Sequence, residues 1–152
     1  LTGGRIKRVK KFLGENFCLT YGDGLSNVNI KKTINFHKKH KKYVTVTAVQ
    51  PKGRFGVVSL DKNKVIKFSE KLKGDQGWVN GGFFVLSKKI FNFIKDDNTI
   101  WEQFSLPKLA LENQIQAYKH DGFWYPMDTI RDKEYLEELW AKKNCPWKSW
   151  DE

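Results

Sequence analysis

The stretch FCLTYGDGLSNVNIKKTINFHKKHKKYVTVTAVQ, residues 17–50, decides the fold class. Its first five residues are largely apolar and predict a strand, which a glycine-bounded turn at residues 22–24 follows directly. Ile30 and Ile34 then fall on one face of a predicted helix, and the β-branched run Tyr43–Gln50 predicts a second strand. Strand, helix and strand in this order predict a right-handed βαβ unit in a parallel sheet.

The rest of the chain predicts an α/β fold with a mostly parallel sheet and one hairpin excursion. The segments RFGVVSL and VIKFSE flank a polar connection at residues 61–64, which is typical of an antiparallel hairpin. Pro107 is expected to kink or break a helix. The later elements are expected at residues 81–87 (strand), 88–94 (helix), 101–112 (helix), 115–120 (strand) and 131–143 (helix).

Length and charge limit the possible classes of protein. The 152 residues suffice for one domain with a real core, so residues 1–152 are interpreted as a single unit. The formal net charge is +11, and much of the excess lies in RIKRVKK at residues 5–11 and HKKHKK at residues 37–42. This balance favours anionic partners, although the second run is more simply the solvated face of a helix. Charge alone does not predict a nucleic-acid binder.

The cysteines and the hydropathy pattern indicate a soluble protein that is not exported. Cys18 and Cys145 form neither a CxxC pair nor a tightly spaced framework, which fits a reducing cytoplasm. No apolar run approaches the roughly 20 residues that span a bilayer, and no basic-then-apolar signal pattern opens the chain. We therefore expect a cytoplasmic location and no membrane partner.

Asp23 lies between two glycines at the end of the first predicted strand. In open parallel sheets ligands bind at the carboxyl ends of strands, and a carboxylate there is a hard oxygen ligand for Mg²⁺. The alternative is an ordinary turn, because Asp-Gly is a strong turn signal anywhere. A second Asp-Gly pair at Asp121 is interpreted only as a turn.

Asp128 is the candidate for a second carboxylate at such a site. It follows the aromatic stretch FWYPM and precedes a predicted helix, which places it at a strand-to-helix junction. A magnesium site for phosphates commonly uses one or two carboxylates together with substrate oxygens. The alternative role is the helix N-cap, for which Thr129 or Asp128 is suited, and the two roles are compatible.

Two further stretches offer polar groups near strand ends. Glu70 and Lys71 combine an acceptor for sugar hydroxyls with a cation for phosphate, but such a pair is also common on surfaces. Asn80, Gly81 and Gly82 enter a strand, where the amide could bind a hydroxyl and the glycines could admit a flat ligand. A β-bulge is the plain alternative for these glycines.

The histidines and tryptophans are interpreted as structural. His37, His40 and His120 lack partners at metal-ligand spacing and are expected on the surface. Scattered tryptophans such as Trp101 and Trp124 favour core or interface packing over base stacking, because they are not interleaved with basic residues.

Several motifs in one order resemble the bacterial sugar-phosphate nucleotidyltransferases, and within them the cytidylyltransferases that act on glucose 1-phosphate. The resemblance covers essentially the whole chain. The stretches GRFG, NGGFFVLS, PMDTIRD and the terminal PWKSW point to the cytidylyl branch. The motifs that carry the resemblance are TGGRIKR, TYGDG, TVTAVQPKGRFG, FSEK, VNGGFFVLS, IWEQ and FWYPMDTIRDKEYLEELW.

The resemblance implies a fold, a reaction and a cofactor. The implied fold is a three-layer α/β/α, Rossmann-like nucleotide-diphospho-sugar transferase domain. The implied reaction converts CTP and glucose 1-phosphate to CDP-glucose and pyrophosphate, without a covalent intermediate. Asp23 and Asp128 would hold the Mg²⁺ that neutralises the phosphates during in-line attack, so that catalysis consists of positioning and charge neutralisation.

The resemblance also implies substrate contacts. Tyr21 and Gly22 would contact the substrates, with Gly22 against the nucleotide, and Arg5 is similar to the family's substrate-contacting arginine. Lys71 would grip the sugar phosphate and is counted among the catalytic residues. The hexose would be bound by Glu70, Asn80 and Gly81. A homo-oligomer with active sites near subunit contacts is expected for the complete enzyme.

Two departures from the family pattern qualify these expectations. The family opens with a glycine-rich loop that contains a catalytic arginine and is followed by a lysine, and this chain begins downstream of it. The chain by itself is therefore expected to be an incomplete enzyme with little or no activity. Leu72 stands where the family usually has proline after the Glu-Lys pair. Two alternatives stay open: another nucleotide such as dTTP or UTP, or a non-catalytic basic binding module that meets nucleic acid or an acidic partner.

Overall fold

The main sheet is mixed, and three of its four strands share one direction. The computed structural model describes residues 1–51, 57–69 and 77–149. Within them the strand order is β1 (Asn16–Thr20), β6 (Val79–Ser87), β3 (Val44–Val49) and β7 (Ile115–His120). β3 and β7 pair in parallel, whereas β6 runs antiparallel to both β1 and β3. The predicted α/β class with a mixed sheet is therefore confirmed, and among the described strands of this sheet one pair is parallel and two pairs are antiparallel.

The predicted strand–helix–strand unit is present, but its strands are not neighbours. Helix α2 (Ile30–His40) connects β1 to β3, and β6 lies between these two strands. The sequence of β6 explains its position. Successive side chains of a strand point to opposite faces, and Phe84, Val85 and Leu86 are all apolar and buried. A strand that is apolar on both faces gains most in the middle of a covered sheet.

The edge strands differ from the central ones in their burial. Along β1 exposed and half-buried side chains alternate, and β7 follows a similar pattern, whereas β3 is almost entirely buried. This alternation is typical of strands with one solvated face. Within the described residues, β1 and β7 are the two edges of the main sheet.

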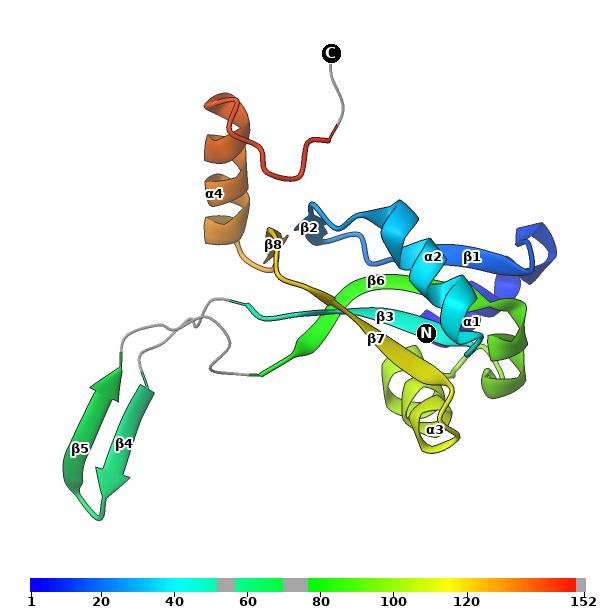
Figure 1. The fold of residues 1–152 in the computed structure, drawn as a ribbon, viewed down its shortest axis with the longest axis horizontal. Coiled ribbons are helices and arrows are strands. Elements are labelled where there is room, and N and C mark those ends of the chain that lie inside the picture. Colours follow the sequence, from blue (N-terminus) through cyan, green and yellow to red (C-terminus); the bar gives the residue numbers. More distant parts are fainter. Residues whose placement is uncertain (52–56, 70–76, 150–152) are drawn as a thin grey trace.

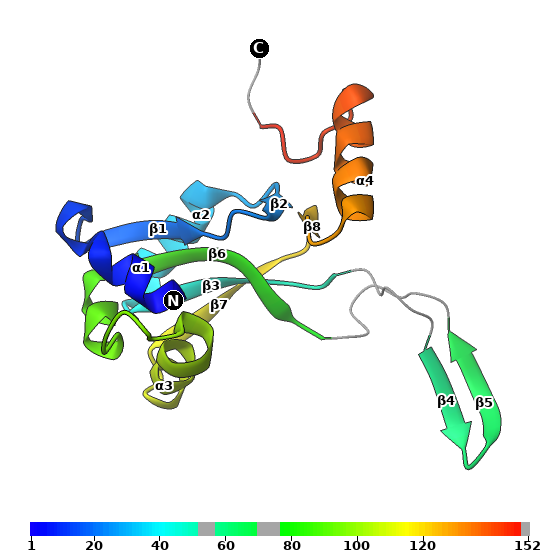
Figure 2. The same ribbon diagram turned by 180° about the vertical axis from the view of Figure 1, so that it is seen from behind.

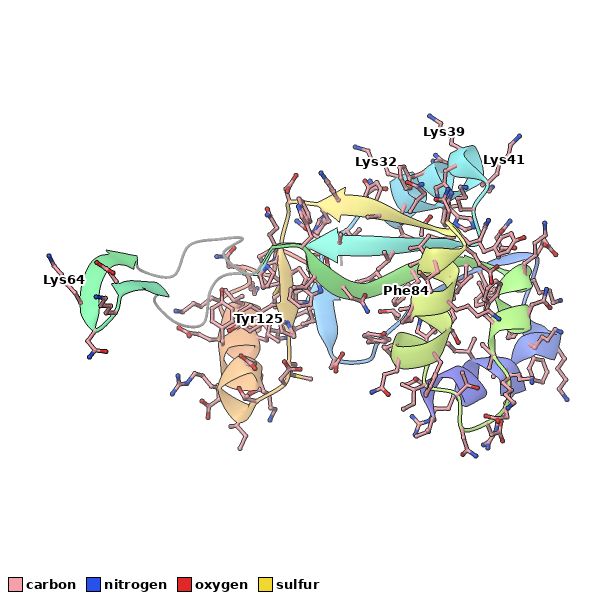
Figure 3. All side chains as sticks on the ribbon, turned by 90° about the horizontal axis from the view of Figure 1, so that it is seen from below. Lys32, Lys39, Lys41, Lys64, Phe84 and Tyr125 are labelled. Atoms are coloured by element: carbon pink, nitrogen blue, oxygen red, sulfur yellow. The ribbon has the colours of Figure 1, made fainter. Side chains whose placement is uncertain are left out.

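Helices cover both faces of the sheet. Figures 1 and 2 show α2 on one face and α1 (Thr2–Arg8) and α3 (Leu106–Leu111) on the other. Figure 3 shows Phe84 pointing from the sheet toward α3. The core between these layers consists of Ile6, Val44, Phe84, Leu86, Ile90, Phe91, Ile94, Trp101 and Leu109.

Two expected helices take other forms. The segment expected as one helix at residues 101–112 is a π-helical turn, Trp101–Ser105, followed by α3, with Pro107 in the first turn of α3. Proline is tolerated there because its missing N–H would have no partner within the helix. The segment after β6 is a 3₁₀ helix, Lys88–Phe93, which Ser87 caps by accepting a hydrogen bond from Lys89 N, and a second one covers Lys10–Phe12. Within the described ranges, no helix is long and apolar enough to cross a lipid bilayer.

Two small sheets complete the fold. The predicted hairpin is confirmed as β4 (Val57–Asp61) paired antiparallel with β5 (Lys64–Ser69). Strand β2 (Gly24–Ser26), which was not predicted, pairs antiparallel with β8 (Trp124–Pro126). Helix α4 (Ile130–Ala141) follows β8, and Thr129 and Asp132 form a capping box at its start.

The basic run on α2 is solvent-exposed. Figure 3 shows the side chains of Lys32, Lys39 and Lys41 extending away from the sheet, and Lys38 is exposed as well. For these lysines the placement agrees with the interpretation of residues 37–42 as a solvated helix face.

The placement of two α2 histidines corrects the expectation that they are surface residues. His37 is 3% exposed and His40 is half-buried. The hydroxyl of Thr45 lies 2.9 Å from His37 Nδ1 and 2.7 Å from His40 Nε2, so the two rings share one partner in β3. Burial, with a smaller contribution from the charge of His40, lowers the pKa of His37 to about 4. The imidazole is tolerated inside because it is neutral and hydrogen-bonded.

The glycines of the TGGR motif allow α1 to pack closely on a neighbouring loop. Gly3 N donates to Thr99 O at 3.0 Å, and a Cβ added at Gly3 would lie 2.8 Å from that oxygen. A Cβ added at Gly4 would lie 2.5 Å from Asp97 Cα. Arg8 and Asp97 also form an ion pair across this contact, at 2.5 Å. The glycines therefore have a structural reason independent of any ligand.

Replacing Gly4 by alanine is expected to lower the free energy of unfolding by about 1–3 kcal/mol, because the methyl group would push against backbone that cannot rotate away. Urea unfolding followed by circular dichroism measures the change. Gly14→Ala is the matched control, since its nearest contact, Asn16 O, would be 3.6 Å away, and we expect it to stay within about 0.5 kcal/mol of the parent. Equal destabilisation by both variants would contradict the packing argument.

Stability is expected to fall as the pH drops from 6.5 toward 4. The pKa of His37 is lowered from 6.5 to about 4 by folding, so between these values the unfolded state binds more protons and protonation favours unfolding. One proton gives a slope of up to about 1.4 kcal/mol per pH unit. Urea unfolding at a series of pH values measures this slope, and His37→Asn should reduce it. An unchanged slope in the variant would show that other groups cause the pH dependence.

Candidate functional site

The candidate site lies where β1 ends, around the link Tyr21–Asp23 between β1 and β2. Tyr21 N donates to Gly82 O at 2.9 Å, which extends the pairing of β1 with β6 by one residue. The Tyr21 ring packs edge-on against Phe84, with ring centroids 5.7 Å apart. These contacts hold Tyr21 beside the start of β6, at the carboxyl end of β1.

A β-bulge at the start of β6 explains the glycine pair of the NGG motif. The register between β3 and β6 shifts between Val46 and Ala48, opposite residues 81–83. Gly82 has φ +76°, and a Cβ there would lie 2.8 Å from Tyr21 Cδ2. The bulge, given above as the alternative for Gly81 and Gly82, is confirmed, and Gly82 is required both for its backbone conformation and for the approach of Tyr21.

Gly81 contributes to the fold through its backbone. A Cβ at Gly81 would lie 2.9 Å from Thr47 O of β3. Its own carbonyl accepts a hydrogen bond from Trp124 Nε1 at 2.8 Å, which ties β8 to the bulge. Trp124 thereby has a structural partner, as expected for the tryptophans.

Asn80, Tyr21 and Glu102 form a hydrogen-bond chain across the site. Asn80 Nδ2 donates to the Tyr21 hydroxyl at 3.3 Å, and Asn80 Oδ1 accepts from Gly82 N at 2.9 Å. Tyr21 donates to Glu102 Oε1 at 2.6 Å. Burial raises the pKa of Tyr21 above its usual range, and the hydrogen bond to Glu102 raises it further. Tyr21 is therefore a neutral phenol near neutral pH.

The pairing of β2 with β8 brings the segments of Asp23 and Asp128 side by side. Met127 N donates to Asp23 O at 2.7 Å, one residue beyond the last strand pair, Gly24 with Pro126. Both aspartates are exposed. Thr129, and not Asp128, is the N-cap of α4. Two residues that are 105 positions apart in the sequence thus lie at the same edge of the site.

The space beside Gly22 is open. A Cβ added at Gly22 would meet no atom within 4 Å, in contrast to Gly81 and Gly82. The absence of a side chain at this position therefore has no packing reason among the described residues. It leaves room next to Asp23 for a ligand group to approach the backbone.

The two carboxylates fit a particular kind of metal site. In the described part of the chain, no group of three or more His, Cys, Asp or Glu side chains is arranged to hold a metal ion. Asp23 and Asp128 instead offer hard oxygen donors on adjacent segments, with open space at Gly22 next to Asp23. This donor set suits Mg²⁺ that takes its remaining ligands from substrate phosphates and water.

The remaining predicted site residues lie either on another element than the two aspartates or outside the residues that the structure describes. Arg5 is exposed on α1, three residues after Thr2. The Thr2 hydroxyl donates to Glu102 Oε2 at 2.8 Å, so the helix that carries Arg5 is joined to the hydrogen-bond chain. Glu70 and Lys71 lie outside the described residues.

Two residues of the site had no predicted role in it. The sequence predicts no role for Glu102 beyond its place in the IWEQ motif, and it predicts only core or interface packing for Trp124. The neighbouring Trp101 is buried. Its apolar side chain indicates that the turn packs on the core, but it does not indicate the direction of the Glu102 side chain. Only the tertiary contacts with Thr2 and Tyr21 indicate that the Glu102 carboxylate is also directed inward.

Comparisons with known proteins find a matching family model and related curated sequences. The family model described as "Nucleotidyl transferase" matches residues 4–134. The chain is 50% identical to the glucose-1-phosphate cytidylyltransferase of Salmonella typhi over 153 aligned positions, which cover 99% of this chain and 60% of that protein. It is 40% identical to the probable glucose-1-phosphate cytidylyltransferase of Bacillus subtilis, covering 99% of this chain and 59% of that protein.

A solved structure supports the fold. The crystal structure of HddC from Yersinia pseudotuberculosis superposes with a TM-score of 0.67 at 24% identity, over 91% of this chain and 62% of that chain. At this identity the likeness concerns the fold alone. The chain spans about 60% of the length of the curated relatives named above.

Proposed function

Because the chain belongs to the nucleotidyl transferase family, we propose that the full protein transfers a cytidylyl group from CTP to glucose 1-phosphate and releases pyrophosphate. The observation that carries the proposal is the 50% identity with the Salmonella typhi glucose-1-phosphate cytidylyltransferase across 99% of this chain. The product is CDP-glucose, and the substrates are CTP and glucose 1-phosphate.

The proposed chemistry needs little more than positioning and charge neutralisation. A phosphate oxygen of glucose 1-phosphate attacks the α-phosphorus of CTP in line, and pyrophosphate leaves from the opposite side. Bound Mg²⁺ would neutralise the negative charge that the phosphates bring together. Asp23 and Asp128 would hold this ion, which is consistent with their exposure on adjacent segments.

The open space beside Gly22 is the proposed place of the nucleotide. Tyr21, which precedes Gly22, is neutral and held from two sides, so it would present a fixed ring edge to the substrate. Asn80, which is exposed at the start of β6, would donate to or accept from a sugar hydroxyl. The roles of Arg5, Glu70, Lys71 and Gly81 in substrate binding remain as the family resemblance implies them.

The assembly state forms part of the same proposal. We expect the full protein to be a homo-oligomer with active sites near the subunit contacts, as the family resemblance implies, and its cysteines favour a cytoplasmic location. Exposed apolar side chains on and beside α4, such as Ile130 and Trp140, which are 77% and 53% exposed, are consistent with a subunit contact there.

Asp23→Asn and Asp128→Asn are each expected to lower kcat/KM of the full protein by about 100-fold or more, because a neutral amide is a poor ligand for Mg²⁺ and leaves transition-state charge uncompensated. Asp121→Asn, in the second Asp-Gly pair, is the matched control and should stay within a few-fold of the parent. Steady-state kinetics over a range of Mg²⁺ concentrations measures the effect. Near-parental turnover of Asp23→Asn would exclude the proposed metal role.

The proposed reaction is tested by pyrophosphate release from CTP, glucose 1-phosphate and Mg²⁺. The assay compares this chain with the full protein, because the curated relatives contain further sequence beyond the matched part. We expect turnover by the full protein and little or none by the 152-residue chain. Turnover with dTTP or UTP in place of CTP would correct the nucleotide. No release with any of these nucleotides would exclude the transferase and favour a basic binding module, whose affinity for acidic partners should fall steeply with salt.

A further inference from the structure

We propose that Glu102 is a positioning residue of the sugar site, which orients the Asn80 amide through the Tyr21 hydroxyl. The inference rests on the proposed function, in which Asn80 binds the hexose. Glu102 lies in the π-helical turn Trp101–Ser105, and its carboxylate and the Asn80 amide both form hydrogen bonds with the Tyr21 hydroxyl. It has no role in the expectations drawn from the sequence.

Both oxygens of the Glu102 carboxylate accept hydrogen bonds from groups whose direction is settled. Thr2 Oγ1 already accepts from Trp101 N at 3.0 Å, and its proton is given to Glu102 Oε2 at 2.8 Å. The Tyr21 hydroxyl, 2.6 Å from Oε1, must donate as well, because an ionised carboxylate can only accept. Glu102 therefore consumes the single proton of the Tyr21 hydroxyl.

The direction of the next hydrogen bond follows from this one. With its proton given to Glu102, the Tyr21 oxygen can only accept, so Asn80 must turn its Nδ2 toward Tyr21. On the other side Gly82 N–H can only donate, so Asn80 must turn Oδ1 toward it, at 2.9 Å. Two independent partners thus select the same orientation of the amide, which resolves the usual ambiguity between its nitrogen and oxygen.

The consequence for a sugar is a defined pattern of donor and acceptor. The second proton of Asn80 Nδ2 and the second lone pair of Oδ1 are left for a ligand, and Asn80 is exposed. Without Glu102, the Tyr21 proton could instead be donated to Asn80 Oδ1. The flipped amide would lose its bond to Gly82 and present the opposite pattern to a sugar hydroxyl. Glu102 would then act on sugar binding without touching the sugar.

The expected kinetic signature is a higher KM for glucose 1-phosphate with a nearly unchanged kcat. Glu102→Ala in the full protein should raise this KM by about 10-fold, because a misdirected Asn80 amide would present the wrong hydrogen-bonding group to the sugar hydroxyl. Tyr21→Phe breaks the same chain and should resemble Glu102→Ala in its effect on this KM. Glu112→Gln, on the exposed end of α3, is the matched control and should leave the KM unchanged.

A double-mutant cycle separates positioning from a general structural role. If Glu102 acts through Asn80, Glu102→Ala should raise the KM in the parent but add less than about 2-fold in an Asn80→Ala background. An equal effect of Glu102→Ala in both backgrounds would overturn the inference. So would an unchanged KM for glucose 1-phosphate in a Glu102→Ala protein that is folded by circular dichroism. If Glu102→Ala does not fold, Glu102→Leu, which fills similar space and cannot accept the Tyr21 proton, takes its place in the cycle.

A readout without turnover distinguishes failure of this inference from failure of the proposed function. Calorimetry measures binding of glucose 1-phosphate, and phenol absorbance measures the pKa of Tyr21. Glu102→Gln should lower this pKa, because the hydrogen bond to the carboxylate raises it. If the parent and the Glu102 variant bind the sugar phosphate equally well, only the positioning role is overturned. A parent that neither binds it nor turns over overturns the proposed function and this inference together.

Discussion

The antiparallel insertion of β6 between β1 and β3 is the constraint on which the rest of the structure depends. Because β6 is apolar on both faces, burial keeps it in the middle of the sheet, and its first residues must then lie beside the last residues of β1. The positive φ of Gly82 at the bulge lets the Tyr21 ring approach the β6 backbone. The site is therefore a consequence of strand order, and its polar groups converge because two oppositely directed strands meet there.

The packing of α1 also supports the candidate site around Tyr21. The close approach of α1 to the loop at Asp97–Thr99 needs the small residues Gly3 and Gly4, and it brings Thr2 against Glu102. From there hydrogen bonds run to Tyr21 and on to Asn80. Two motifs that look unrelated along the chain, TGGR and NGG, are thus joined through one glutamate. A rigid support of this kind is what a site needs when its chemistry consists of positioning.

Part of the site could be predicted from single positions, and part could not. Asp23 and Asp128 could be proposed as candidates because ligands bind at the carboxyl ends of strands, with a turn and a helix N-cap as their alternative roles. Glu102 is not recognisable, because a glutamate in a helical turn normally faces water. The surface assignment of His37 and His40 failed for the opposite reason: the histidines occur in a lysine-rich run, and only the shared contact with Thr45 shows that this face of α2 turns inward.

The class of fold, the hairpin, most strand and helix positions, and the family can be predicted without the structure, because these depend on local periodicity and on motifs that keep their order. The tertiary structure alone decided that β6 separates β1 from β3, that the unexpected strand β2 pairs with β8, and that Asp23 and Asp128 lie on adjacent segments. The physical reason is that strand order and side-chain direction are set by burial against distant parts of the chain. Periodicity shows which residues prefer to be buried, and long-range packing decides which partners bury them.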